Sequence, residues 1–109
     1  MTRKSAIVIG VGAELGLGAA LCKLIARRNY HVFVAGRSSE KLDIVVRAIT
    51  ANGHHAESIV TDATSEPDVL KLFNKAMTPR DGIEPPSLVV YNVGNNRRVD
   101  FRELTLDEF

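Results

Sequence analysis

A glycine-rich segment near the N-terminus places the strongest constraint on the fold. Residues 10–18 read GVGAELGLG, directly after an apolar run at residues 6–9 and directly before apolar residues at helical spacing. A short, continuous apolar run is typical of a parallel strand that is covered on both faces. The sequence therefore predicts a strand, a tight turn and a helix. In such a turn the glycines permit positive φ, close approach of a ligand to the main chain, and close packing of the helix on the strand.

Strand and helix patterns alternate along the rest of the chain. Strands are predicted at residues 6–9, 31–35, 56–60 and 88–91, with a loop containing Pro79, Gly82, Pro85 and Pro86 before the last one. The predicted apolar faces of the three helices are Leu17, Ala20, Leu21, Leu24 and Ile25; Leu42, Val45, Val46 and Ile49; and Val69, Leu70, Phe73, Ala76 and Met77. This βαβαβαβ order predicts an α/β fold with a doubly wound parallel sheet and helices on both faces.

Local signals mark the ends of these helices. Asn29 is a plausible stop for the first helix, and Ser38 or Ser39 can cap the second. Residues 52–53 (Asn-Gly) close the second helix, and Ser65 caps a third helix that has Pro67 in its first turn.

Composition excludes several classes of protein. The chain has 109 residues and a formal net charge of +1 without a basic stripe, which disfavours nucleic-acid binding. No apolar run approaches the ~20 residues of a membrane helix, and the early apolar run contains two glycines and no obvious cleavage site, unlike a signal peptide. One cysteine, Cys22, excludes an intramolecular disulfide and fits a reducing compartment, so we expect a cytoplasmic location.

The turn and the helix that follows it favour dinucleotide binding. A helix N-terminus offers free N–H groups and the positive end of its dipole to phosphates. No lysine follows the glycines, so the segment is not a P-loop. A plain tight turn is the alternative.

The cofactor-selecting position is expected about twenty residues further on, at the end of the second strand. Residues 35–38 read Ala-Gly-Arg-Ser and offer no carboxylate for a free ribose 2′-hydroxyl. Arg37 can pair with a 2′-phosphate, which favours NADP(H) over NAD(H). NAD and a simply solvated arginine stay open as alternatives.

Four motifs in order resemble the short-chain dehydrogenase/reductase family. The spacing of Gly12, Gly16 and Gly18 is similar to the family's glycine motif. Asp62 resembles the aspartate that meets the adenine ring, and residues 92–94 (Asn-Val-Gly) resemble the family's Asn-Ala-Gly. Residues 101–109 look like the segment that leads into the family's fourth helix.

The resemblance implies a partial Rossmann sheet ordered 3-2-1-4 and hydride transfer between NADP(H) and a carbonyl or alcohol. It also implies a small-molecule substrate, and leaves formation of a homo-oligomer open. The implied cofactor-binding residues are Gly12, Ala13, Glu14, Leu15, Gly16, Leu17, Gly18, Arg37, Ser38, Asp62, Ala63, Asn92, Val93 and Gly94.

Some residues depart from the family pattern. Val11 stands where a bracing threonine is common, Tyr91 and Val93 alter the Asn-Ala-Gly motif, and Glu14 can repel a 2′-phosphate. The family's catalytic Tyr-x-x-x-Lys and its upstream serine are absent, because neither Tyr30 nor Tyr91 has a lysine four residues later. A non-catalytic dinucleotide-binding or interaction fragment is therefore the alternative function.

The last residues predict the start of another helix. Thr105 and Glu108 form a capping box, with Leu104 and Phe109 placed for a hydrophobic staple. We expect residues 1–109 to be the N-terminal, cofactor-binding half of a longer Rossmann domain, cut at the start of its fourth helix. Neither residues 54–55 (His-His) nor Cys22 has the partners of a metal or reactive-thiol site.

Overall fold

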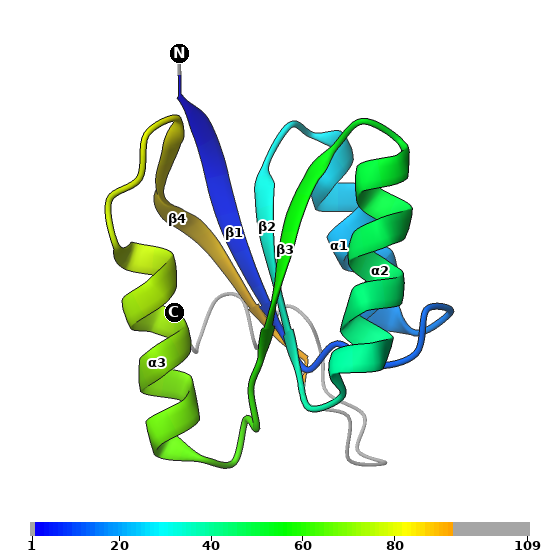
Figure 1. The fold of residues 1–109 in the computed structure, drawn as a ribbon, viewed down its shortest axis with the longest axis vertical. Coiled ribbons are helices and arrows are strands. Elements are labelled where there is room, and N and C mark those ends of the chain that lie inside the picture. Colours follow the sequence, from blue (N-terminus) through cyan, green and yellow to red (C-terminus); the bar gives the residue numbers. More distant parts are fainter. Residues whose placement is uncertain (1, 93–109) are drawn as a thin grey trace.

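The computed structural model describes residues 2–92, which form one parallel sheet with three helices (Figure 1). The strands lie in the order β3-β2-β1-β4, as the family resemblance implied. The elements are β1 (Arg3–Ile9), α1 (Leu17–Arg27), β2 (His31–Gly36), α2 (Ser39–Ala51), β3 (His55–Val60), α3 (Glu66–Met77) and β4 (Ile83–Tyr91). The predicted features at residues 93–109, including Val93, Gly94 and the capping box, lie outside the described residues.

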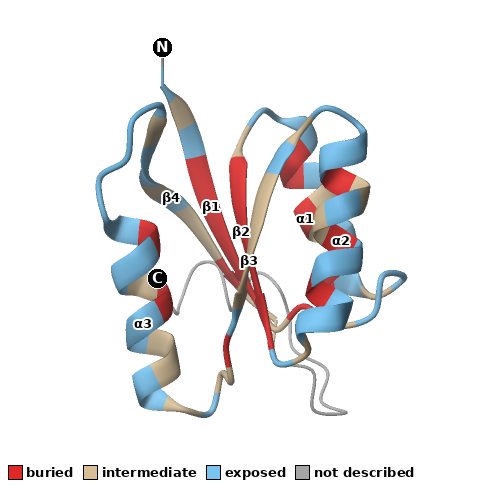
Figure 2. Ribbon diagram, viewed as in Figure 1, coloured by how far each residue is buried: buried red, intermediate tan, exposed pale blue. Residues whose placement is uncertain are grey.

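The helices cover both faces of the sheet, which confirms the doubly wound arrangement. Helices α1 and α2 lie together on one face and α3 lies on the other (Figure 1). Alternate residues of β1 enter two separate cores: Ala6 and Val8 pack toward α1 and α2, while Ile7 and Ile9 pack toward α3. The buried residues therefore concentrate in the central strands β1 and β2 (Figure 2). This double covering explains the unbroken apolar run at the start of the sequence.

The predicted apolar face of α1 is correct at Ile25 and Leu21, which belong to or pack against the core, and wrong at Leu17, Ala20 and Leu24. Helix α1 buries Gly18, Ala19, Cys22, Ile25 and Ala26. Leu17 and Leu24 are about half exposed, because the helix packs on the sheet through small residues that let the two backbones approach closely. A spacing argument weighted toward large apolar side chains does not detect such a face.

The apolar face predicted for α3 is correct at Ala76 and at Phe73, which packs against the core, and wrong at two other positions. Its buried residues are Leu72 and Ala76, whereas Leu70 and Met77, which we expected in the core, are 56% and 52% exposed. The apolar face predicted for α2 is correct at Leu42, Val45 and Ile49.

Strand β4 begins five residues earlier than predicted. It includes Pro85 and Pro86, which we assigned to a loop. Within the described residues β4 has a strand partner only on its β1 side, so prolines that cannot donate a hydrogen bond are tolerated there. Register shifts on either side of the Ser5–Pro86 pair accommodate the extra residues.

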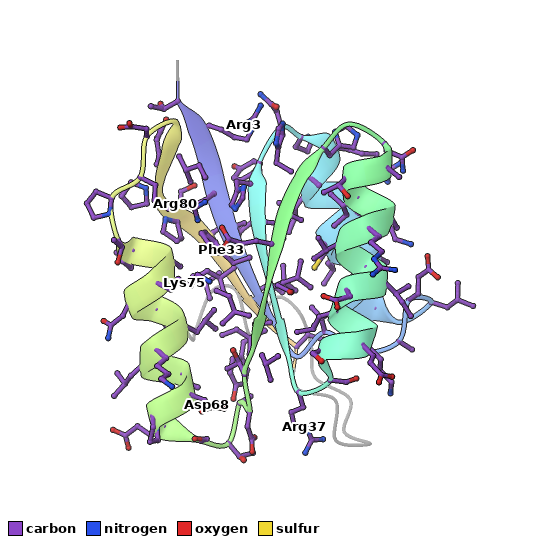
Figure 3. The ribbon with its side chains drawn as sticks, viewed as in Figure 1. Arg3, Phe33, Arg37, Asp68, Lys75 and Arg80 are labelled. Atoms are coloured by element: carbon purple, nitrogen blue, oxygen red, sulfur yellow. The ribbon has the colours of Figure 1, made fainter. Side chains whose placement is uncertain are left out.

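A polar cluster at the amino end of the sheet ties α3 and the following loop to β2 and β3. The carboxylate of Glu57 on β3 accepts a hydrogen bond from His31 at 2.8 Å, pairs with Arg80, and lies 3.7 Å from Lys75. Figure 3 labels Lys75 and Arg80, the two cations of this cluster. The ring of His31 in turn meets Phe33 edge-on, with 5.0 Å between ring centroids. Burial raises the pKa of Glu57, but hydrogen bonds from Arg80 and His31 outweigh it, and the net pKa is lowered.

We expect Glu57→Gln to lower the free energy of unfolding by about 1–3 kcal/mol near neutral pH, because it removes a charged acceptor. The native pKa of Glu57 lies below its ordinary value of 4.5. The stabilisation is therefore fully present above that value, and it is lost as the pH falls through the native pKa. Urea titrations of both proteins at several pH values test this. A stability gap that stays constant from neutral pH to below the native pKa would contradict it.

Cys22 is fully buried on α1, and burial raises the pKa of its thiol to about 12. We expect iodoacetamide at pH 8 to alkylate it at least ~100-fold more slowly in the folded chain than in urea, because thiolate is scarce and access needs local opening. Mass spectrometry follows the reaction. Equal rates with and without urea would show that α1 does not pack as described.

Candidate functional site

A cavity of about 290 Å³ lies where the carboxyl ends of β1, β2 and β3 meet. The turns that follow these three strands build its walls, which is where ligands bind in open parallel sheets. The lining residues are Gly10, Val11, Gly12, Gly36, Arg37, Ser38, Lys41, Thr61, Asp62, Ala63 and Thr64.

The glycine turn after β1 is fastened to the end of β2. Gly10 has φ +92°, a conformation that other residues rarely adopt. The backbone N–H groups of Gly10 and Val11 both donate to the carbonyl of Ala35 at 2.9 Å. Helix α1 then starts after Gly16, and no side chain caps it. The N–H groups of its first turn therefore have no side-chain acceptor within residues 2–92 and can bind other acceptors, such as phosphate oxygens.

Gly18 and Asn92 meet behind this turn. A Cβ atom on Gly18 would lie 3.1 Å from Cα of Val11 and 3.3 Å from Nδ2 of Asn92. The N–H of Asn92 donates to the carbonyl of Ile9 at 2.8 Å, which holds the end of β4 beside the end of β1. The absence of a side chain at Gly18 is therefore what lets α1 start so close to both strands. Asn92 does not line the cavity itself.

Gly36 makes the closest backbone contact. A Cβ atom on Gly36 would lie 2.1 Å from the carbonyl oxygen of Val11, far inside van der Waals contact. The carbonyl of Gly36 also accepts from the N–H of Thr61 at 2.7 Å. Gly36 thus joins three turns of the site, although we did not name it as a site residue from the sequence.

Two cations lie at the second wall, at the start of α2. Arg37 is exposed and extends from the end of β2 (Figure 3). Lys41, one turn into α2, lines the same cavity. The hydroxyl of Ser38 accepts a hydrogen bond from the N–H of Lys41 at 3.3 Å, so this predicted cofactor residue also caps the helix. The sequence analysis did not predict Lys41, because it expected the cofactor-selecting residue only at the end of the second strand, and Lys41 lies in the helix that follows.

Asp62 forms the third wall, in the turn that follows β3. Its carboxylate accepts hydrogen bonds from Oγ1 of Thr64 at 2.7 Å and from the N–H of Thr64 at 2.9 Å. These bonds lower the pKa of Asp62, and the positive charge of Arg37 lowers it further. The carboxylate is therefore ionised and faces the same space as the guanidinium. Ala63 follows, and its carbonyl accepts from the Tyr91 hydroxyl at 3.4 Å.

The remaining predicted site residues lie away from this cavity. Ala13, Glu14 and Leu15 form the exposed tip of the glycine turn, where Leu15 is 97% exposed. The carboxylate of Glu14 lies 3.5 Å from Nζ of Lys23. Gly16 and Leu17 begin α1.

The described residues hold no group of metal-ligating side chains. None of the helices within residues 2–92 has the length and hydropathy needed to span a bilayer.

The strand order, the glycine turn and the cavity at the carboxyl ends of β1, β2 and β3 define a Rossmann-type fold. The profile of the short chain dehydrogenase family matches residues 4–109. The chain therefore belongs to the short-chain dehydrogenase family, as the sequence motifs predicted.

Individual relatives agree with this assignment. An uncharacterized oxidoreductase of Listeria monocytogenes is 36% identical over 77 residues, which cover 71% of this chain and 31% of the relative. Gluconate 5-dehydrogenase of Gluconobacter oxydans is 32% identical over 94 residues, covering 86% of this chain and 36% of that enzyme. The chain thus spans about a third of the length of these relatives.

Solved structures show the same fold. A short-chain dehydrogenase from Rhodopseudomonas palustris superposes with a TM-score of 0.72 at 29% identity, covering 95% of this chain and 46% of the other. A hydroxysteroid dehydrogenase from Escherichia coli superposes with a TM-score of 0.77 at 26% identity, covering 88% of this chain and 39% of the other.

Proposed function

We propose that this chain is the NADP(H)-binding portion of a short-chain dehydrogenase/reductase that transfers a hydride between the nicotinamide and a carbonyl or alcohol. The observation that carries the proposal is the cavity at the carboxyl ends of the strands. It has the glycine turn after β1 on one side and two cations on the other. These are the complements of a pyrophosphate and of a 2′-phosphate, respectively.

Residues on three turns would position the cofactor. The pyrophosphate would lie against Gly12 and the first turn of α1, which is open because no Cβ or neighbouring atom fills the space at Gly12. Asp62 and Ala63 would border the adenine, and Asn92, with Val93 and Gly94, would flank the nicotinamide ribose. When bound, the nicotinamide supplies or accepts the hydride.

Arg37 and Lys41 would bind the 2′-phosphate that distinguishes NADP(H) from NAD(H). A guanidinium matches a phosphate bidentately, and Lys41 adds a second positive charge from the same wall. Glu14, which we expected to oppose a 2′-phosphate, lies near Lys23 and outside the cavity, so its charge is partly balanced. Asp62 is the one carboxylate that lines this cavity in the described part of the chain.

The rest of the proposal concerns the whole protein. We propose that residues 1–109 form the cofactor-binding half of the domain, while the proton-transfer residues and the substrate-binding residues belong to a part of the fold beyond this sequence. The single cysteine supports a cytoplasmic location, and the family resemblance supports a small-molecule substrate and leaves homo-oligomer formation open.

Isothermal titration of the chain with NADPH and with NADH tests the cofactor assignment. We expect NADPH to bind at least ~10-fold more tightly, since only NADPH offers a phosphate to the two cations. Equal affinities, or tighter binding of NADH, would overturn the NADP(H) proposal and leave the family assignment intact.

A further inference from the structure

A second cavity, of about 490 Å³, lies between the C-terminal ends of α1 and α2. Helices in this fold run antiparallel to the strands, so this cavity is at the amino end of the sheet, opposite the cofactor cavity. Its lining residues are Lys23, Arg27, Ile49, Asn52 and His54. Three of the five carry basic side chains and none is acidic.

The two permanent cations are arranged on one side of the cavity. Lys23 and Arg27 are four residues apart on α1, so both project from the same face of the helix. Within residues 2–92, no carboxylate lies within 4 Å of the Arg27 guanidinium, while Lys23 has Glu14 at 3.5 Å. Arg27 is exposed, and its fork of donors is therefore open to an incoming anion.

The other side of the cavity comes from the end of α2. Ile49 is buried and forms an apolar floor. Nδ2 of Asn52 donates to the carbonyl of Ala48 at 3.1 Å, which fixes the amide at the rim. His54 is half-buried and stands opposite α1. The cavity thus combines charged donors with an apolar floor, as small-molecule sites do.

The C-terminal end of a helix normally repels anions, because its last carbonyls are unpaired. Here those carbonyls have donors. The carbonyl of Ile49 accepts from the N–H groups of Asn52 and His54, both at 3.2 Å, and the carbonyl of Thr50 accepts from Gly53 at 3.0 Å. Capping reduces the repulsion at the point where an anion would enter.

Further basic side chains lie near this end of the sheet, around His55. The pKa of His55, next to the cavity, is lowered by desolvation and by the charges of Arg3, His31 and His54. Two carboxylates of the described residues already have basic partners: Glu14 lies beside Lys23, and Glu57 pairs with His31, Lys75 and Arg80 on the other face of the sheet.

We propose that the cavity between the ends of α1 and α2 is a binding site for a small phosphate-bearing anion, held by Arg27 and Lys23 with His54 and Asn52 at the rim. The guanidinium of Arg27, unpaired within residues 2–92, and the ammonium of Lys23, whose charge Glu14 balances in part, would hold the phosphate, and the apolar floor would accept the uncharged part of a phosphorylated small molecule. The site is separate from the cofactor cavity and does not depend on the proposed NADP(H) binding.

Inorganic phosphate, titrated at constant ionic strength into the ¹⁵N-labelled chain, tests the site. We expect saturable amide shifts at Asn52, Gly53 and His54 and around Arg27. The double variant Lys23→Gln/Arg27→Gln should weaken this binding at least ~10-fold. Arg47→Gln, on the exposed surface of α2 outside the cavity, is the matched control and should bind as the unmodified chain does.

Phosphate can also enter the cofactor cavity, so Arg37→Gln serves as a second control that should leave the shifts at Asn52 and His54 unchanged. Three results would overturn the proposal. These are the absence of shifts at these residues, the same shifts with sodium chloride, and equal weakening of phosphate binding by the double variant and by Arg47→Gln. Circular dichroism verifies that each variant is folded.

Discussion

Gly36→Ala is expected to destabilise the chain by at least ~1–3 kcal/mol, the usual cost of forcing extra atoms into a packed region. The added Cβ would lie 2.1 Å from the Val11 carbonyl oxygen, a backbone atom that cannot rotate away. The turn that carries Val11 is itself held in place, because the N–H of Val11 donates to the Ala35 carbonyl at 2.9 Å. Relief of the clash must therefore separate the end of β2 from the glycine turn.

Gly12→Ala is the matched control for this change. Nothing lies within 4 Å of a Cβ atom at Gly12, so the fold should tolerate the methyl group, with a stability change within ~0.5 kcal/mol. The same methyl group would occupy space that the proposed pyrophosphate needs, so cofactor binding should weaken. Urea unfolding of both variants decides the matter: similar midpoints for the two would show that Gly36 does not hold the turns together.

Arg37→Ala is expected to weaken NADPH binding at least ~10-fold and NADH binding by less than about twofold, because only NADPH carries the 2′-phosphate. Lys41→Ala should act in the same direction with a smaller effect, since an ammonium is a point charge without a bidentate fork. Both residues line the cofactor cavity. Titration of each variant with both cofactors separates a loss of phosphate recognition from a general loss of binding.

Two controls sharpen this test. Arg47→Ala removes a positive charge from the exposed surface of α2 and should change neither affinity. Salt should weaken NADPH binding to the unmodified chain more than to Arg37→Ala, because the contact is ionic and exposed. Parallel losses of NADPH and NADH affinity in Arg37→Ala would mean that the arginine does not recognise the 2′-phosphate.

The sequence predicted the topology because its strongest signals are local. The apolar run in β1, the glycine turn and the caps at Ser38 and Ser65 each act within a few residues, and the structure reproduces them. The pattern of alternating strands and helices then restricts the sheet to few arrangements.

The errors arose where contacts distant in sequence decide the outcome. The buried face of α1 depends on how closely Gly18 and Ala19 approach the sheet, which a count of large apolar residues does not include. The early start of β4 depends on its pairing with β1, which overrides the preference of Pro85 and Pro86 for loops.

For the candidate site, too, the sequence predicted some residues and not others. Motif positions such as Gly12, Arg37 and Asp62 do meet in one cavity. Gly36 and Lys41 carry no motif of their own. They belong to the site because the carboxyl ends of parallel strands converge there.

The central claim is that a dinucleotide binds across the carboxyl ends of β1, β2 and β3. A crystal structure of the chain with NADPH tests it most directly. The account predicts the pyrophosphate against the backbone N–H groups at the start of α1, the 2′-phosphate within hydrogen-bonding distance of Arg37, and the adenine beside Asp62. A cofactor bound elsewhere, or a glycine turn that faces away from the pyrophosphate, would contradict it.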